Sequence, residues 1–275
     1  MKNLPNEAMT HAGRFHADDV FSAALLRILK PDITIIRRNK VPEGYEGLVF
    51  DLCGGEYDHH NENLLARDNG VPYASFGLLW KEYGAELVSK SAAEAFDESF
   101  IQPLDIQDNM GGNNQLARAI TQANPTWDSG LESDACFFKA VDVATFILQN
   151  EIASMRSCEN AKAIVGEALS KMEDDTVVLD VGVPWKGILI PSKAKYVVYP
   201  SARGGYNIQA VPIEIGSQEC KLPFPAHWRG KNREELENII GIPGVNFCHP
   251  GGYLMNTDTE EQAICICKLI VVPQN

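Results

Sequence analysis

"THAGRFHADDV", residues 10–20, places two histidines and two aspartates between a short apolar segment and the start of a helix. We predict that helix over residues 18–30, because apolar residues recur there at helical spacing, acids fill the first turn and Pro31 follows its end. The segments "DITIIRR" (32–38) and "GLVFDL" (47–52) are rich in β-branched or apolar residues and are predicted strands. This order of strand, helix, strand and strand predicts an α/β layer with a mostly parallel sheet flanked by helices.

Helical residue patterns continue along the chain to about residue 174, where strand-like patterns begin. They cover residues 74–88, 92–106 and, with breaks allowed, 132–172. Shorter segments of strand character follow, separated by prolines and glycines. We therefore predict two domains, an α/β domain that carries the ligand-type residues and a smaller C-terminal α+β domain, at residues 1–172 and 173–275.

The end of the chain is predicted to alternate between regular structure and loop. "REELENII" (233–240) reads as a helix, "GVNFCH" (244–249) as the last strand and "PGGYLMNT" (250–257) as a loop. Thr257 and Glu260 have the spacing of a capping box, which predicts a final helix after them.

Composition indicates a folded, acidic protein. The chain has 275 residues, 45% of them hydrophobic, and a formal net charge of −13, which argues against a protein that coats duplex DNA. It shows neither the apolar run of a signal peptide nor a continuous apolar stretch of roughly 18 residues, so we expect a cytoplasmic location and no membrane partner. Seven scattered cysteines without a CxxC pair suggest reduced thiols. Homo-oligomerisation stays open.

One segment departs from the acidic balance. Residues 185–233 carry eight Lys or Arg against two acids, interleaved with Trp and Tyr. Two interpretations stay open: a solvated surface with core aromatics, or a groove for a phosphate-bearing ligand whose bases stack. For such a ligand, arginines that clamp phosphate and glycines that admit it to backbone N–H groups are the candidates: Arg203, Gly204, Arg229, His249, Gly251 and Gly252.

Ligand-type residues form four clusters, of which three lie where loops follow strands: His11, His16 and Asp18; Asp51; and Asp58, His59 and His60. The fourth, Asp105 with Asp108, follows a predicted helix that leads into a Gly-rich turn. In a parallel α/β sheet the loops after the carboxyl ends of the strands converge on one edge, so we expect one shared site. Asp19 is interpreted as an acid that stabilises the start of its helix rather than as a ligand.

Several carboxylates around one pocket would repel each other, and bound divalent cations are the ordinary remedy. Imidazole with carboxylate, and without thiolate, suits Mn²⁺, Fe²⁺, Co²⁺ or Zn²⁺ better than Ca²⁺. Two such cations roughly 3.5 to 4 Å apart can share a bridging carboxylate and activate water for attack on a phosphoester. The clusters therefore predict a site for two divalent cations.

The sequence resembles the DHH phosphoesterase superfamily, and within it the Myg-type group (melanocyte proliferating gene family), described as DHH-like 3'-5' RNA exonucleases. The similarity rests on "THAGRFHADDV", "VFDLCGGEYDHHN" and "LDIQDN", and on the later blocks "VVYPSARGGYNIQAVPI", "HWRG" and "GIPGVNFCHPGGYL". It spans nearly the whole chain and implies a DHH-like fold for the first domain and substrate binding by the second.

The resemblance also implies roles for individual residues. One metal would be held by His11, His16 and Asp51, and the other by Asp18, Asp51, His59 and Asp108, with Asp51 bridging. His60 would face the substrate phosphate or the leaving group, and Asp58 would orient a histidine. The family relation favours Mn²⁺ or Mg²⁺.

The expected function is metal-dependent phosphodiester hydrolysis, with a 3'-5' exonuclease on RNA or short oligonucleotides as the first hypothesis. The alternative is a phosphatase for small substrates, such as pyrophosphate or a nucleoside bisphosphate, on the same metals. A third hypothesis is a binding protein without catalysis, in which the metal is structural and its coordination shell is closed.

Overall fold

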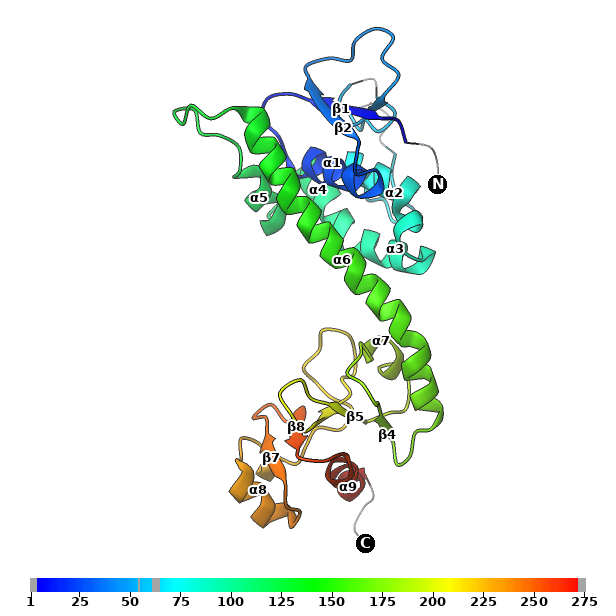
Figure 1. The fold of residues 1–275 in the computed structure, drawn as a ribbon, viewed down its shortest axis with the longest axis vertical. Coiled ribbons are helices and arrows are strands. Elements are labelled where there is room, and N and C mark those ends of the chain that lie inside the picture. Colours follow the sequence, from blue (N-terminus) through cyan, green and yellow to red (C-terminus); the bar gives the residue numbers. More distant parts are fainter. Residues whose placement is uncertain (1–3, 54, 61–64, 272–275) are drawn as a thin grey trace. The chain divides into compact units, whose positions relative to one another are not determined.

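The structure is a computed structural model that describes residues 4–53, 55–60 and 65–271 (Figure 1). Gly54 and Asn61, which belong to the second quoted motif, lie outside the described residues. Packing divides the chain into two compact units, one up to Met155 and one from Arg156 onward. This division falls within a long helix rather than after it, and each unit is described by itself below.

The N-terminal unit is built on a three-stranded parallel sheet. Strands β1 (Glu7–His11), β2 (Thr34–Arg38) and β3 (Leu48–Val49) have the order β2-β1-β3, with β1 parallel to both neighbours. The prediction of a parallel sheet is confirmed. Since β1 lies in the centre, the loops that leave the carboxyl ends of β1 and β3 start next to each other.

Helices cover one face of this sheet, as Figure 1 shows for the N-terminal unit. They are α1 (Ala17–Leu29), α2 (Ser75–Leu87), α3 (Lys90–Phe96), α4 (Gln102–Met110), α5 (Gln115–Thr121) and the first part of α6 (Ser133–Ser170). The strands contribute Ala8, Ile35 and Leu48 to the core beneath them. The opposite face is covered by a small cluster in which Met9 and Val49 contact loop residues. Helices therefore flank the sheet on one side.

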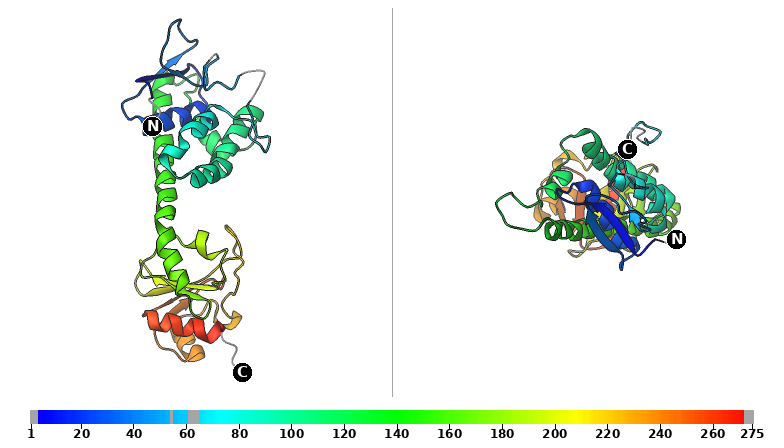
Figure 2. Two further views of the ribbon diagram at one scale, coloured as in Figure 1. Left: turned by 90° about the vertical axis from the view of Figure 1, so that its right-hand side faces the viewer. Right: turned by 90° about the horizontal axis from the view of Figure 1, so that it is seen from above.

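Two predicted helices differ from the observed ones. The segment predicted as one helix over 92–106 consists of α3, a π-helical turn (Asp97–Ile101) and α4, which continues to Met110. The long helix α6 (Ser133–Ser170) runs without the breaks that the sequence allowed (Figure 2). Within the described residues, no helix is both long enough and apolar enough to cross a membrane.

The C-terminal unit contains a five-stranded mixed sheet. Its order is β4-β5-β6-β8-β7, and only the β4–β5 pair is parallel. The strands are β4 (Thr176–Val178), β5 (Tyr196–Pro200), β6 (Tyr206–Ala210), β7 (Val245–Cys248) and β8 (Leu254–Thr257), and the helices are α7 (Lys186–Leu189), a 3-10 turn (Ala226–Trp228), α8 (Arg233–Ile240) and α9 (Glu260–Val271).

Two predictions for the end of the chain are wrong. The segment 250–257, predicted as a loop, contains β8, which lies inside the sheet between β6 and β7. The predicted capping pair, Thr257 with Glu260, does not form: Thr259 caps α9 instead, because its backbone N–H donates to Gln262 Oε1 and its hydroxyl accepts from the Gln262 N–H. Thr257 donates its hydroxyl to the carbonyl of Thr259.

Candidate metal centre

Asp51 lies two residues after the end of β3 and has a backbone conformation that residues other than glycine rarely adopt. Its φ is +45°, in the left-handed region, which costs free energy for any residue with a Cβ. The Asp51 N–H donates to the Ser75 hydroxyl at 2.9 Å and to the Tyr57 carbonyl at 3.1 Å, and these bonds hold the turn. The turn aims the Asp51 carboxylate back over the end of β1, where His11 is the last residue.

The two oxygens of Asp51 face two different histidines. Oδ2 lies 3.3 Å from His11 Nε2, and Oδ1 lies 3.1 Å from His59 Nε2. Asp51 is 3% exposed, so these contacts form in an environment of low dielectric constant. A carboxylate shared between two ligand groups in this way has the geometry of a bridging ligand.

His59 also faces two further carboxylates, those of Asp18 and Asp108. Its Nε2 lies 3.9 Å from Asp18 Oδ2 and 3.3 Å from Asp108 Oδ2. The Asp18 carboxylate also accepts hydrogen bonds from the backbone N–H groups of Ser75 and Phe76 at the start of α2, at 3.0 and 2.8 Å. Asp18 thereby fixes α2 against α1 and holds its own carboxylate at the site.

Asp19, which the sequence interpretation treated only as an acid that stabilises its helix, lies beside His11 in the structure. Asp19 does stabilise the start of α1, since its Oδ1 accepts the His16 N–H at 2.8 Å. Its Oδ2 lies 3.3 Å from His11 Nε2. His16, by contrast, has a side chain that is 52% exposed and lies 3.9 Å from Asp108. His11 and Asp51 are therefore grouped with Asp19, and His16 lies at the rim.

His60, Asp58 and Asp105 complete the predicted set. Asp58 Oδ1 accepts the backbone N–H of His60 and lies 2.9 Å from His60 Nδ1, so it can orient that imidazole. The His60 side chain is 52% exposed. Asp105 pairs with Arg67 at 2.7 Å, whereas Asp108 lies 3.3 Å from His59 Nε2, so the fourth motif reaches the site through Asp108.

Two asparagines at the site were missed by the sequence interpretation. Asn109 Oδ1 lies 3.0 Å from His59 Nδ1, on the opposite side of the ring from Asp51. Asn124 Oδ1 accepts the N–H of Phe15 at 3.0 Å, and its Nδ2 donates to the Phe15 carbonyl at 2.7 Å, which fixes the loop that carries His16. Asn109 directly follows Asp108 in "LDIQDN", and this position next to a candidate ligand could have identified it from the sequence. No sequence feature distinguishes Asn124.

The electrostatics of the described residues show an excess of buried negative charge. Burial raises the pKa of Asp18, and the nearby Asp51 and Asp108 carboxylates raise it further. Burial also raises the pKa of Asp19, to about 7, although His11 opposes the shift. Burial lowers the pKa of His11 and His59, but their hydrogen bonds to Asp51 together with the charges of the nearby carboxylates outweigh it, so that each pKa rises to about 9.

These residues fit divalent cations. Three groups have ligand atoms close enough to surround one ion: His11, Asp19 and Asp51; Asp18, His59 and Asp108; and Asp51, His59 and His60. The buried Oδ2 of Asp19 makes no hydrogen bond within the described residues, and it is directed at the first group. Imidazole and carboxylate without thiolate suit Mn²⁺, Fe²⁺, Co²⁺ or Zn²⁺.

The site opens into a cavity of about 500 Å³ in the N-terminal unit. Its lining includes the four ligand-type residues His16, His59, His60 and Asp108, together with side chains of α4 and α5. A ligand in this cavity would contact the half-exposed His60 and approach the buried His59 at the cavity wall, an access that a purely structural metal would not need.

The six predicted substrate-binding residues form two groups in the C-terminal unit. His249, Gly251, Gly252 and Arg229 lie together: the Gly251 N–H donates to His249 Nδ1, and a Cβ at Gly252 would collide with Arg229. Arg203 and Gly204 lie in the turn between β5 and β6, where Asn256 donates to the Gly204 carbonyl. Because Leu254 pairs with Gln209 and Thr257 with Tyr206, the two groups lie at opposite ends of β8.

Most aromatic side chains of the basic segment 185–233 belong to the hydrophobic cores of the C-terminal unit. Trp185, Tyr196, Phe224 and Trp228 are buried there, whereas Tyr199 and Tyr206 are partly exposed, so burial favours the interpretation of core aromatics. Several of its cations are also engaged, since Lys195 pairs with an acid and Lys221 donates to three backbone carbonyls.

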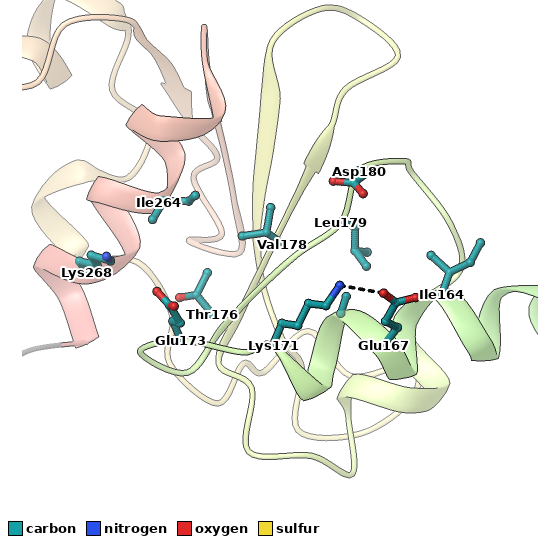
Figure 3. A pocket seen from close by; sticks show the side chains of 11 residues that line it. Ile164, Glu167, Lys171, Glu173, Thr176, Val178, Leu179, Asp180, Ile264 and Lys268 are labelled. Atoms are coloured by element: carbon teal, nitrogen blue, oxygen red, sulfur yellow. Dashed lines mark hydrogen bonds and ion pairs between the residues drawn. The ribbon is translucent and has the colours of Figure 1, made fainter.

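A second pocket, of about 290 Å³, lies within the C-terminal unit (Figure 3). Residues of α6, β4 and α9 line it, and its rim carries both signs of charge, including the ion pair between Lys171 and Glu167. The predicted substrate-binding residues lie elsewhere in the unit, so this pocket is separate from both groups.

Comparison with known proteins shows the family of the chain. Residues 7–271 match the family model described as "MYG1_exonuc: Uncharacterised protein family (UPF0160)". The "MYG1 protein C694.04c" of Schizosaccharomyces pombe is 29% identical over 100% of both chains. The "MYG1 exonuclease" of Homo sapiens is 29% identical over 96% of this chain and 85% of its own, and the "MYG1 protein" of Dictyostelium discoideum is 26% identical over 93% of each. No solved structure shows a significant match. The match along nearly the whole chain shows that the protein belongs to the MYG1 exonuclease family.

Proposed function

We propose that the chain is a divalent-metal-dependent phosphodiester hydrolase of the DHH type that acts as a 3'-5' exonuclease on RNA or short oligonucleotides. The observation that carries the proposal is the position of Asp51, whose two oxygens lie 3.3 Å from His11 Nε2 and 3.1 Å from His59 Nε2. The printed name of the human relative, "MYG1 exonuclease", supports the same reaction class.

Two cations, with Mn²⁺ as the first choice and Mg²⁺ as the second, would share the Asp51 carboxylate. His11 and Asp19 would complete one ligand set, with His16 at its rim. Asp18, His59 and Asp108 would complete the other. When bound, such cations lower the pKa of a coordinated water and neutralise charge that develops on a phosphate during attack.

The chain's own residues would supply the remaining functions. Asn109 accepts from His59 Nδ1, so that Nε2 faces the carboxylates. Asp58 engages His60 Nδ1, which leaves His60 Nε2 as the nitrogen that can contact the substrate phosphate or protonate the leaving oxygen. Since His60 lines the cavity, a scissile phosphate held there would lie within its reach.

The first predicted domain, residues 1–172, would carry the chemistry. The second, residues 173–275, would bind the rest of the substrate. Arg229, His249, Gly251 and Gly252 form one proposed contact group, and Arg203 with Gly204 forms another. An arginine can clamp a phosphate with two hydrogen bonds, and glycines let backbone N–H groups approach it.

The test compares substrates on metal-stripped protein with and without added Mn²⁺. The probes are a short RNA labelled at its 5' end, the same RNA labelled at its 3' end, bis-p-nitrophenyl phosphate and pyrophosphate. A Mn²⁺-dependent ladder from the 5'-labelled RNA, with immediate release of a labelled mononucleotide from the 3'-labelled RNA, supports the proposal. Turnover of pyrophosphate alone would replace it with a small-molecule phosphatase, and the absence of turnover with added Mn²⁺, Mg²⁺, Co²⁺ or Zn²⁺ in turn would replace it with a binding role.

A further inference from the structure

Trp127 is the most exposed large hydrophobic side chain of the described residues. It lies in the loop between α5 and α6 and is 97% exposed. The other three tryptophans, Trp80, Trp185 and Trp228, are 3%, 5% and 7% exposed. A tryptophan side chain that is almost fully exposed to water contributes no hydrophobic stabilisation to the fold. Its exposure therefore suggests a role in binding.

Both ends of this loop are attached to the loop that carries the metal-site histidines. At the first end, Asn124 makes two hydrogen bonds with the backbone of Phe15, at 3.0 and 2.7 Å. At the second end, Ser133 donates its hydroxyl to the Gly13 carbonyl at 2.7 Å. Phe15 precedes His16 directly, and the tip of the loop thus projects from a base that is fixed to the candidate metal centre.

The surroundings suit a single-stranded nucleic acid. Arg14, between the two attachment points, is exposed, and α5 lines the metal-site cavity with Ala117 and Thr121 before the loop begins. The loop itself carries the exposed acids Asp128 and Glu132, so its attraction for a polyanion would come from the indole ring and not from charge. Stacking on an aromatic ring tolerates every base, because every base has a π-face.

We infer that Trp127 is a stacking platform for a nucleobase of a single-stranded substrate whose terminal phosphodiester lies in the metal-site cavity. The inference rests on the proposed function and adds a residue that binds a base of its nucleic-acid substrate, a contact that a small phosphate ester without a base cannot make. A protein partner is the less favoured occupant, since a stable protein interface buries about 800 Å² on each side and this loop offers only Trp127 and Leu131 as large exposed apolar side chains.

The test uses the fluorescence of Trp127, the exposed member of the four tryptophans, in metal-free full-length protein, where binding occurs without turnover. Quenching by acrylamide is measured alone and with three probes: a single-stranded RNA of ten nucleotides, an abasic oligomer of the same length, and pyrophosphate. We expect the RNA to shield Trp127 from acrylamide, and the abasic oligomer and pyrophosphate to leave it accessible. Trp127→Phe identifies the signal, because the shielded component should vanish in that variant.

Affinities of the variants provide the second readout. Trp127→Ala should raise the dissociation constant for the RNA on the order of tenfold, whereas Trp127→Phe, which keeps a ring, should raise it by less. Phe146→Ala, on α6 and 68% exposed, is the matched control and should leave the constant unchanged. Both substituted side chains are exposed, so both variants should fold.

Three outcomes would overturn the inference: equal shielding by the abasic oligomer, an unchanged dissociation constant in Trp127→Ala, or shielding that grows with protein concentration without RNA, which would indicate self-association. Hydrolysis of bis-p-nitrophenyl phosphate by the same wild-type preparation with Mn²⁺ distinguishes failure of the stacking role from failure of the proposed function. If it occurs while RNA leaves Trp127 accessible, the stacking role fails and the proposed chemistry stands. If neither this hydrolysis nor Mn²⁺-dependent shortening of the RNA occurs, the proposed function itself fails.

Discussion

Asn109 Oδ1 lies 3.0 Å from His59 Nδ1, while His59 Nε2 faces the carboxylates of Asp51 and Asp108 on the other side of the ring. An amide oxygen only accepts hydrogen bonds, so this contact keeps a proton on Nδ1 and leaves Nε2 as the nitrogen for a cation. Asn109 itself is held by α4, because its Nδ2 donates to the Asp105 carbonyl at 2.9 Å and the Tyr73 carbonyl at 3.2 Å.

Replacing Asn109 with Leu should therefore weaken Mn²⁺ binding by about 10- to 100-fold, the usual effect of removing a partner that orients a metal-binding histidine. Asn109→Asp keeps an acceptor and should retain most of the affinity. Isothermal titration of metal-stripped protein measures both. Asn150→Leu, at an exposed position of α6, is the matched control, and equal Mn²⁺ affinities in the Asn109→Leu and Asn150→Leu variants would contradict the orienting role.

Asn124→Ala should loosen the loop that carries His16, because it removes both hydrogen bonds to the Phe15 backbone. We expect a loss of about 1–3 kcal/mol in the free energy of local opening, the cost of leaving partly buried polar groups unpaired. Hydrogen exchange at the Phe15 amide, which donates to Asn124, reports this opening directly. Asn113→Ala, which removes an exposed side chain, should leave that exchange rate unchanged, and an equally slow rate in both variants would refute the anchoring role.

The apparent affinity for Mn²⁺ should rise with pH between about 6.5 and about 9. In the metal-free protein the carboxylate of Asp51 holds the pKa of His11 and His59 at about 9, so both imidazoles carry a second proton at neutral pH. A cation can bind only the deprotonated nitrogen and must release these protons, and each release becomes easier as the pH approaches 9. Titration calorimetry in two buffers of different ionisation enthalpy counts the protons; binding without proton release would contradict this account.

The cysteines should divide by reactivity. Cys53, Cys158 and Cys265 are exposed. Burial raises the pKa of Cys248 to about 11, against the charge of Arg229, and that of Cys267 to about 12, against a hydrogen bond with Thr176. Because the thiolate is the reactive form, the three exposed cysteines should react with a thiol reagent at pH 8 well before Cys248 and Cys267. Peptide mapping by mass spectrometry identifies the modified residues, and early modification of Cys267 would show that the C-terminal core is open.

Much of the N-terminal unit could be predicted from the sequence because its signals are local. The helix after the first motif and the two following strands have clear periodicity, and parallel strands bring His11 and Asp51 to one edge of the sheet. The role of Asp19 could not be predicted, since the same residue can cap a helix and face a histidine, and only the orientation of α1 decides that it does both.

The C-terminal unit was harder to predict, because its determinants are contacts between distant residues. Strand β8 follows Gly251 and Gly252, which indicate a turn, and contains Asn256, which is rare in strands. In the structure Asn256 is buried and donates to Asn207 and Gly204 while it accepts from Asn246, so tertiary hydrogen bonds offset its weak propensity. The burial of Tyr196 and Trp228 likewise depends on how the sheet and α9 pack, which composition does not reveal.

The proposed bridging role of Asp51 is tested most directly by Asp51→Asn, which keeps the shape of the side chain and removes its charge. Asp142→Asn is the matched control, since Asp142 is 70% exposed and forms a surface pair with Arg27. The measurement is the Mn²⁺-dependent release of nucleotides from a short RNA, with Mn²⁺ affinity measured on the same samples. We predict that Asp51→Asn lowers both by at least about 100-fold, while Asp142→Asn equals the wild type. Wild-type affinity and activity in Asp51→Asn would contradict the two-cation site.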